Sequence, residues 1–526
     1  MRSRALVAGA ACALSLAVCS VPAHAESPRP DRDYFENDRG VRVPFTPTYE
    51  SWFGGARYRA NYTRAILENV ATTALELAIY WYDPSLNVVD WQFPSLDSKL
   101  SSSEAVRFDD NLLSTNYIHH PIAGSTHYIL SRVNGFGIPG SFAASAIAST
   151  GYEFLFEWRE LVSINDLIVT PFGGTAMGEF FHQLGNYLNS APRKTAPELV
   201  GNSGTFARGA AKTTFGVFRN VHDELDDPPE PPPEPLDNLG LSTAYAHDFA
   251  LRFQEIVVEN PRGRRVELYG VRGEFELAAM PGMLRPGVFQ RWFSNGNFTR
   301  FDFEISANGR SRENLMRFDS HLFGYYAQSA RTRASARAFE AALASGLTYR
   351  DRQWAGERDQ FGIVHLPHPA AQAWLPAGPA RLRLGADVSA DFGSIHSAAF
   401  RTYAARFGVD GTKSSLSRHG YLHTWGLSAG AAASLRIEDV ELGGSARYGR
   451  YESIDGVERE QEHVVRDMHG VETIRQLGVT LALEPRNSSV AAWFEFAETR
   501  RSSRLGNDLD EVDAYRRASV SLGLHF

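Results

Sequence analysis

The sequence contains very little cysteine, and this excludes several kinds of chemistry. Its 526 residues include two cysteines, Cys12 and Cys19, and both lie near the N-terminus. Residues 1–25 have a basic start, an apolar run and a small-residue site ending at Ala25, which is the pattern of a secretory signal peptide. The mature chain is therefore expected to have no disulfide, no thiolate metal site and no cysteine nucleophile.

Long basic runs and long apolar runs are also missing. The formal charge is −8 and no block of Lys and Arg occurs, which argues against a nucleic-acid partner. Outside residues 1–25 no stretch offers about 18 uncharged apolar residues, so the sequence predicts no transmembrane helix. A secreted chain of this kind can still span a membrane if its strands close into a barrel.

The C-terminal part of the sequence alternates between apolar and polar residues. In AYRRASVSLGLHF, the apolar residues Val520, Leu522, Leu524 and Phe526 alternate with small or polar ones, as in the last strand of outer-membrane barrels. Similar runs begin near residues 242, 269, 300, 315, 336, 381, 420, 440, 472 and 489. We therefore predict a mainly β protein, with an antiparallel transmembrane β-barrel of about 12 strands (10 to 14) over residues 237–526.

The polar face of these strands carries charges of both signs, which would point into the barrel. A soluble β-sandwich is disfavoured because its core could not hold so many charges. Inside a narrow barrel these charges have two possible roles. In one they form an ion-pair lattice that conducts no ions, and in the other they line a small pore. The charged residues are Arg272, Glu274, Glu276, Arg300, Asp302, Glu304, Arg317, Asp319, Arg381, Arg383, Asp387 and Asp391.

Residues 26–225 have a different character and are predicted to form a periplasmic α-helical domain. Apolar residues recur at mostly helical spacings over residues 62–82, and residues 140–160 form a second predicted helix. Ser141, Ser145 and Ser149 recur every four residues there, and such a stripe lets another helix approach closely. The Pro-rich residues 226–236 are predicted to be a stiff linker to the barrel.

One part of the helical domain resembles a known family. The motifs are NYIHHPIAGSTHY from residue 116, Arg132 with Gly135, STGYE from residue 149, and SINDLIVTPFGGTAMGE from residue 163. Together, over residues 111–185, they resemble the bacterial domain-of-unknown-function family 3943. The resemblance implies an envelope protein, often joined to an outer-membrane barrel, and it implies no established activity. At Tyr152 the family more often has Trp.

The same segments hold more ionisable and amide groups than apolar sequence normally carries. These groups are Asn116, His120, Arg132, Glu153, Glu157, Asn165, Asp166, Glu179 and His182. Such groups must pair with one another or bind a ligand. One interpretation is a structural network, with Arg132 paired to Glu153 or Glu157 and the Asn165-Asp166 pair capping a turn.

A second interpretation is a hydrolytic site acting on lipid or envelope glycan. His120 would act as general base, Asp166 or Glu157 would orient it, and Arg132 would hold a phosphate or an oxyanion. Residues 26–225 contain no Gly-x-Ser-x-Gly elbow, so no nucleophile is indicated in the helical domain.

A third interpretation is a divalent-metal site. Glu179 and His182 are three residues apart, which puts both on one helical face, and Glu153, Glu157 or His120 would complete the site. Within residues 26–225 only one Glu-x-x-His occurs, whereas a di-metal bundle needs two.

The sequence therefore predicts an outer-membrane barrel with a helical domain that faces the periplasm or enters the barrel mouth. An envelope structural or ligand-binding role is the first interpretation, and a lipid- or glycan-directed hydrolase or a small pore are the alternatives. Expected partners are outer-membrane lipid and the barrel-assembly machinery, with a lipid or glycan as a further candidate ligand. A divalent metal is the candidate cofactor.

Overall fold

The computed structural model describes most of the chain after residue 60. The described residues are 34–36, 42–44, 60–82, 94–109, 111–158, 160–190, 214–226, 239, 241, 245–280, 283–284, 286–331, 335–354, 357–407, 415–455, 469–485, 488–506 and 509–526. The predicted signal peptide and residues 227–236 of the predicted linker lie outside them.

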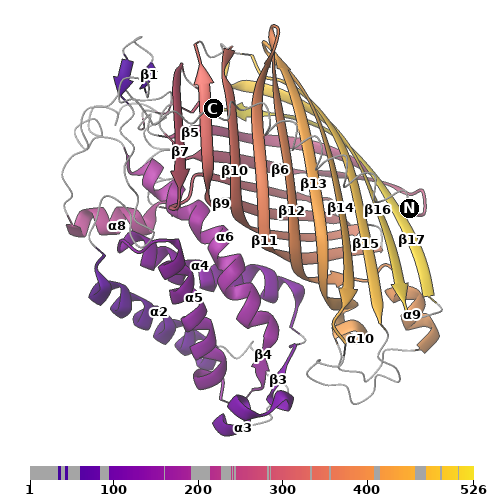
Figure 1. The fold of residues 1–526 in the computed structure, drawn as a ribbon. Coiled ribbons are helices and arrows are strands. Elements are labelled where there is room, and N and C mark those ends of the chain that lie inside the picture. Colours follow the sequence, from indigo (N-terminus) through magenta and orange to yellow (C-terminus); the bar gives the residue numbers. More distant parts are fainter. Residues whose placement is uncertain are drawn as a thin grey trace.

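Twelve antiparallel strands close into a barrel, as the alternating sequence predicted (Figure 1). They are β5 (Ala246–Glu259), β6 (Arg265–Ala278), β8 (Phe298–Ala307), β9 (Arg312–Ala330), β10 (Arg337–Trp354), β11 (Glu357–Ala377), β12 (Ala380–His396), β13 (Tyr421–Ile437), β14 (Val440–Ser453), β15 (Gly470–Leu483), β16 (Val490–Leu505) and β17 (Leu509–His525). The last strand pairs with the first, with Leu522 opposite Phe253, so the sheet has no free edge there.

Three short strands extend the barrel sheet at one place. Strand β7 (Gly287–Phe293) pairs with β9 beyond the end of β8, so β7 and β8 follow one line that is interrupted at residues 294–297. Strands β1 (Tyr34–Glu36) and β2 (Arg42–Pro44) continue the sheet from β7. The helical domain contacts the barrel at this interruption.

The barrel wall is apolar outside and charged inside, as the two-residue period requires. On β5, for example, Arg252 is 1% exposed whereas Phe253 is 71% exposed. Arg252 pairs inside the barrel with Glu274 at 2.6 Å and with Glu495 at 3.0 Å. Charges of both signs therefore face the lumen, and these three form ion pairs there.

The two ends of the barrel differ in their connections. At the end where β5 begins and β17 finishes, which we call the terminal end, two-residue turns join β11 to β12 and β13 to β14. The connection that contains β7 is the longer exception. The opposite end carries residues 397–420, with α9 (Phe400–Phe407) and α10 (Ser415–His419), and residues 454–469. Outer-membrane barrels have short periplasmic turns and longer outer loops, so we expect the terminal end to face the periplasm.

The helical domain is built around three helices that pack closely. These are α4 (His120–Val133), α5 (Ile138–Gly151) and α6 (Ile164–Leu188). A Cβ on Gly124 of α4 would lie 2.0 Å from the carbonyl oxygen of Thr170, so the two backbones touch where α4 crosses α6. No helix among the described residues is both long enough and apolar enough to cross a membrane.

The remaining elements complete the domain. They are α2 (Tyr62–Tyr82), α3 (Leu96–Ser101), η1 (Ser103–Ala105), β3 (Val106–Arg107), η2 (Thr115–His119), η3 (Tyr152–Phe156), β4 (Val162–Ser163) and α8 (Val217–Asp226). Both η2 and η3 are single π-helical turns. Such turns are rare in proteins as a whole, and those that occur often lie near functional sites.

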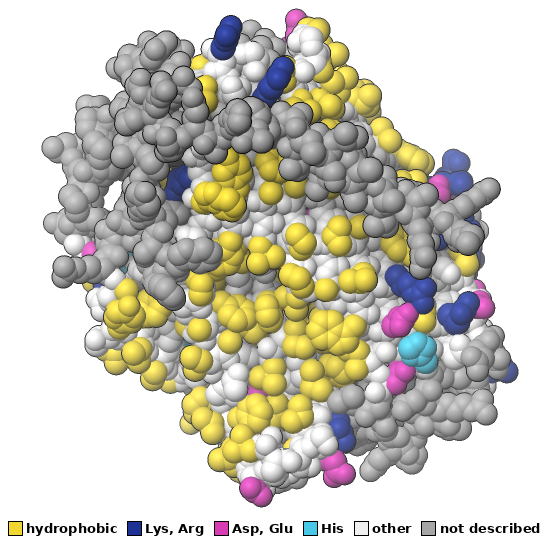
Figure 2. All heavy atoms as spheres, in the orientation of Figure 1, with side chains coloured by type: hydrophobic (Ala, Val, Ile, Leu, Met, Phe, Trp, Pro, Cys, Tyr) yellow, Lys and Arg dark blue, Asp and Glu magenta, His cyan; other side chains and the backbone are white. Residues whose placement is uncertain are grey.

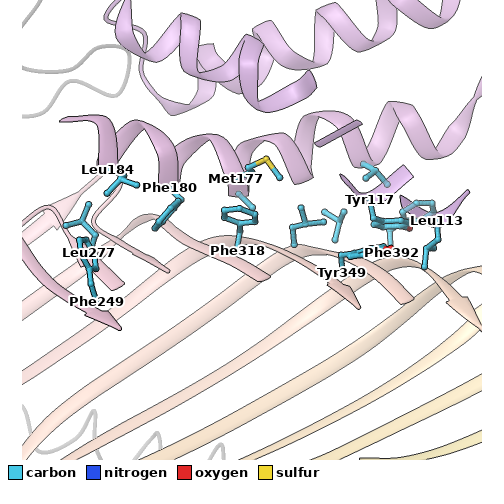
Figure 3. Packing of buried hydrophobic residues seen from close by; sticks show 14 of the residues in the cluster. Leu113, Tyr117, Met177, Phe180, Leu184, Phe249, Leu277, Phe318, Tyr349 and Phe392 are labelled. Carbon is cyan, nitrogen blue, oxygen red and sulfur yellow. The ribbon is translucent and has the colours of Figure 1, made fainter. Parts of the chain in front are cut away.

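Helix α6 lies on the outer wall of the barrel, across the strands (Figures 1 and 3). Beneath it runs a row of apolar residues that are direct neighbours in the sheet register: Phe249, Phe275, Phe301, Phe318, Leu347, Val364 and Phe392. Met177 and Phe180 of α6 pack on this row, and Ser320 donates its hydroxyl to the carbonyl oxygen of Ala176 at 2.9 Å. The helical domain therefore docks on the outside of the barrel wall through α6, and α6 does not enter the barrel mouth.

Candidate functional site

A short parallel pairing brings two distant acidic residues together. Strand β3 pairs with β4, with Arg107 opposite Ser163. Asp109 follows β3 and Asn165 follows β4 at the same offset, so the backbone N–H of Asp109 donates to Asn165 Oδ1 at 3.1 Å. Ser163 caps α6 by accepting from the backbone N–H of Asp166, which fixes Asp166 in the first turn of the helix.

His120 lies beside Asp109 and Asp166, and the proline that follows it fixes its position. Pro121 has no backbone N–H and cannot continue an α-helical pattern. The turn before it is the π-helix η2, closed by a hydrogen bond from His120 N–H to the carbonyl oxygen of Thr115. This wider turn places Asn116 and His120 in the same cluster as the two aspartates.

Asp109, His120 and Asp166 form one compact group. One ligand atom from each lies within 4.8 Å of the other two, and His120 Nε2 is 3.3 Å from Asp166 Oδ1. Asp109 and Asp166 are 1% and 5% exposed, whereas the side chain of His120 is 26% exposed. The cluster is thus buried on the carboxylate side and reaches the surface along His120.

Amide groups hold the carboxylates in place. Asp109 accepts from Asn111 Nδ2 at 2.7 Å, from Asn165 Nδ2 at 2.8 Å and from Asn116 Nδ2 at 3.2 Å. Asn165 Nδ2 also donates to Asp166 Oδ1 at 3.0 Å, so one amide links both carboxylates. Within the described residues, no Lys or Arg lies at ion-pair distance from Asp109.

Two polar atoms of the cluster have no hydrogen-bond partner among the described residues. One is Oδ1 of Asn116, a residue that is 0% exposed. The other is Nε2 of His120, because its approach to Asp166 lacks hydrogen-bond geometry. Burial lowers the pKa of His120, although the charges of Asp109 and Glu76 act in the opposite direction. Buried polar atoms without partners are uncommon, and these two are available to a ligand.

Arg132 and Glu179 lie in a second cluster, which binds the barrel. Arg132 Nε donates to Glu179 Oε2 at 2.9 Å, and Glu179 also accepts from Tyr128 and Gln183 at 2.7 Å each. Arg132 Nη1 donates to the Asn295 side chain, in the interruption between β7 and β8, at 2.6 Å. This pair therefore docks the helical domain on the barrel.

The pairing of Arg132 corrects one sequence prediction. Its partner is Glu179, not Glu153 or Glu157. Gly296 has φ +77° beside this pair, and a Cβ there would lie 2.3 Å from Glu179 Oε1. Arg132 is thus committed to a structural contact and does not join His120.

The remaining candidates are dispersed. Glu153 Oε2 accepts from the backbone N–H of Ser163 at 2.7 Å, and the carbonyl oxygen of Glu157 accepts from Lys99 Nζ at 2.9 Å. His182 lines an apolar cavity of about 280 Å³ between α4, α6 and α8. Among the described residues, the group that could hold a metal is Asp109, His120 and Asp166, so Glu153, Glu179 and His182 do not form the predicted set.

Asp109 was not among the residues singled out from the sequence. Asp109 lies in the short acidic stretch FDDN at residues 108–111, eleven positions before His120. This stretch is only a weak sequence signal for a site. Only the pairing of β3 with β4 brings it to Asp166. Such a long-range pairing has no signature in the local sequence.

Comparison with protein families finds one match. Residues 105–207 match a domain of unknown function, DUF3943. Residues 105–207 are thus similar to this family. The match contains all three residues of the cluster, and the domain is joined to a twelve-stranded barrel. The resemblance inferred from the motifs is thereby confirmed. A comparison with curated proteins found no match.

Several solved barrels share a weak likeness. The in-vitro folded OmpT of Vibrio cholerae is 9% identical, with 54% of this chain and 98% of that chain covered, at a TM-score of 0.21. The translocator domain of the autotransporter NalP from Neisseria meningitidis is 12% identical, with 53% and 88% covered, at a TM-score of 0.22. These TM-scores are too low to carry an argument, so the fold rests on the strand pairing itself. The closed barrel and its apolar outer wall are those of an outer-membrane protein.

Proposed function

We propose that the protein is an outer-membrane barrel whose helical domain binds a divalent transition-metal ion at Asp109, His120 and Asp166. The observation that carries this proposal is the convergence of one ligand atom from each residue within 4.8 Å. Metal–ligand bonds of about 2.0–2.2 Å need such a spacing, with small adjustments on binding. The unpartnered His120 Nε2 supplies the nitrogen ligand.

The ligand types favour a transition metal over calcium or magnesium. Calcium and magnesium prefer sites built from oxygen ligands alone, whereas one imidazole with two carboxylates suits zinc, manganese or iron. The cluster also has the outer partners that such sites use to orient their ligands. Asn165 donates to both carboxylates, and Asn111 donates to Asp109.

A metal-dependent hydrolase is the second candidate function. Three protein ligands leave one coordination position for water or substrate, which is the arrangement of catalytic rather than structural zinc sites. The side-chain oxygen Oδ1 of Asn116, buried and without a partner among the described residues, is available to a molecule bound there. The earlier interpretation with Arg132 as the anion-binding group loses support, because Arg132 is paired with Glu179.

The barrel itself is proposed to be a closed scaffold and not a pore. Ion pairs join strands that are not neighbours, and so they cross the lumen. Arg383 of β12 pairs with Glu276 of β6 near the terminal end, Arg517 of β17 with Glu304 of β8 further along, and Arg501 of β16 with Asp359 of β11 toward the opposite end. A lumen crossed by side chains at three heights leaves no continuous path for ions.

Metal-dependent stability tests the proposed site. The unfolding temperature of full-length protein in detergent is measured for two samples. One has been treated with chelator, and the other has then received zinc or manganese. A ligand at about 100 times its dissociation constant stabilises the folded state by about 2.7 kcal/mol, so the unfolding temperature should rise. The Asp166→Asn variant should lose this response and the exposed-residue control Glu104→Gln should keep it. An equal response in parent and Asp166→Asn contradicts the proposal.

A further inference from the structure

Helix α2 has the opposite polarity from a helix on the surface of a soluble domain. Its polar side chains face the other helices: Asn69 contacts Ser131 and His127, and Glu68 contacts His222. Its large apolar side chains face outward and are 55% to 86% exposed: Tyr62, Ile66, Leu67, Val70, Leu75, Ile79 and Tyr82. A soluble helix buries its apolar stripe and exposes its polar face.

Helix α5 follows the same pattern. Ser141, Ser145 and Ser149 are buried toward the bundle, whereas Ile147 is 72% exposed. The hydroxyl oxygens of Ser141 and Ser145 have no partner among the described residues, so the serines serve close packing. Small residues at helix contacts with apolar residues outside are typical of helices that lie in lipid.

The helical domain also lies at the height of the apolar wall of the barrel. Residues of that wall are exposed on both sides of the row that α6 covers. Ile305 lies further toward the opposite end than Phe301 on β8 and is 62% exposed. Val388 lies further toward the terminal end than Phe392 on β12 and is 53% exposed. Helix α6 therefore crosses the middle of the surface that faces lipid.

The apolar surface continues from the barrel onto the helices. In Figure 2, hydrophobic side chains cover the middle of the visible face, and charged side chains gather at its edges. An aromatic group marks one end of the helical surface, where Trp81 stacks on Trp158 at 6.0 Å and Tyr80 packs against Tyr152. Trp and Tyr are enriched where a membrane meets water.

We propose that the helical domain lies in the lipid beside the barrel, with the exposed faces of α2 and α5 in contact with phospholipid acyl chains. The domain would then form a lateral, membrane-embedded flank of the barrel wall and not a domain that hangs in the periplasm. The polar faces of its helices contact one another inside the domain, and α6 packs on the apolar row of the barrel wall. A domain embedded in lipid needs both kinds of contact. The proposal is independent of the metal site.

Fluorescence quenching in vesicles tests this placement. Because both cysteines, Cys12 and Cys19, lie in residues 1–25, single-cysteine variants of residues 26–526 can carry one fluorophore each. The test positions are Leu75→Cys on α2 and Ile147→Cys on α5. Leu522→Cys on the barrel wall is the lipid control, and Arg310→Cys in an exposed turn is the water control. The vesicles contain phosphatidylethanolamine, phosphatidylglycerol and a doxyl-labelled phospholipid, with iodide as the alternative quencher on both sides.

The probes at Leu75 and Ile147 should be quenched by the doxyl lipid to the same extent as the probe at Leu522, and iodide should have little effect on them. Quenching by iodide to the extent seen at Arg310 would place this face in water and overturn the proposal. Protection from both quenchers would show that protein covers the face, and it would overturn the proposal as well. Each variant must first show the gel shift between unheated and boiled samples that a folded barrel gives.

Discussion

Arg383 on β12 and Glu276 on β6 form an ion pair of 2.8 Å across the barrel lumen. Strands β8, β9, β10 and β11 lie between these two strands in the sheet, so the pair joins opposite walls. Two further pairs, Arg517 with Glu304 and Arg501 with Asp359, cross the lumen at other heights. These three ion pairs therefore link the walls of the barrel through its interior.

The first prediction concerns conduction. Purified protein inserted into a planar bilayer should show no steady ionic current, because the crossing pairs block the lumen. The measurement is single-channel conductance in potassium chloride, with a general porin as the positive control. A reproducible conductance from the parent protein would mean that the lumen is a pore.

The second prediction separates the two polar clusters of the helical domain. Arg132→Ala leaves the fully buried Glu179 without its counter-ion, and such a change typically costs about 3–5 kcal/mol. His120→Ala removes a side chain whose Nε2 has no hydrogen-bond partner, so the stability should change little. Thermal unfolding of the full-length variants in chelator measures both. Equal destabilisation by the two substitutions would assign His120 to the structural network.

The third prediction tests the contact between α4 and α6. Gly124→Val should destabilise the helical domain strongly, because a Cβ at Gly124 would meet the carbonyl oxygen of Thr170 at 2.0 Å. The matched control is Gly151→Ala at the end of α5, where a Cβ meets nothing within 4 Å and alanine favours the helix. Limited proteolysis reports the difference. If both variants resist protease like the parent, the helices are not packed this closely.

The barrel could be predicted from sequence because its signal is local. A strand that separates lipid from a polar interior must alternate at every second residue, and twelve such strands were expected and found. The signs of the lumen charges were also readable. Their cross-lumen pairing was not, because it depends on which strands face each other after closure.

The candidate site could be predicted only in part. His120 and Asp166 stand in recognisable motifs and do come together, at 3.3 Å. Asp109 reaches them through the pairing of β3 with β4, and Arg132 finds Glu179 because α4 crosses α6. The position of the helical domain was not readable either, since an apolar helix face looks the same in sequence whether protein or lipid covers it.

The most direct test of the account is the metal content of the purified protein. Parent and variants are equilibrated with zinc, dialysed against buffer and analysed by elemental mass spectrometry. The parent should retain about one zinc per chain, as a site with three protein ligands does. Asp109→Asn and His120→Ala should lose it while Glu104→Gln keeps it. A parent without bound zinc, manganese or iron, or variants that retain as much metal as the parent, would contradict the metal site at Asp109, His120 and Asp166.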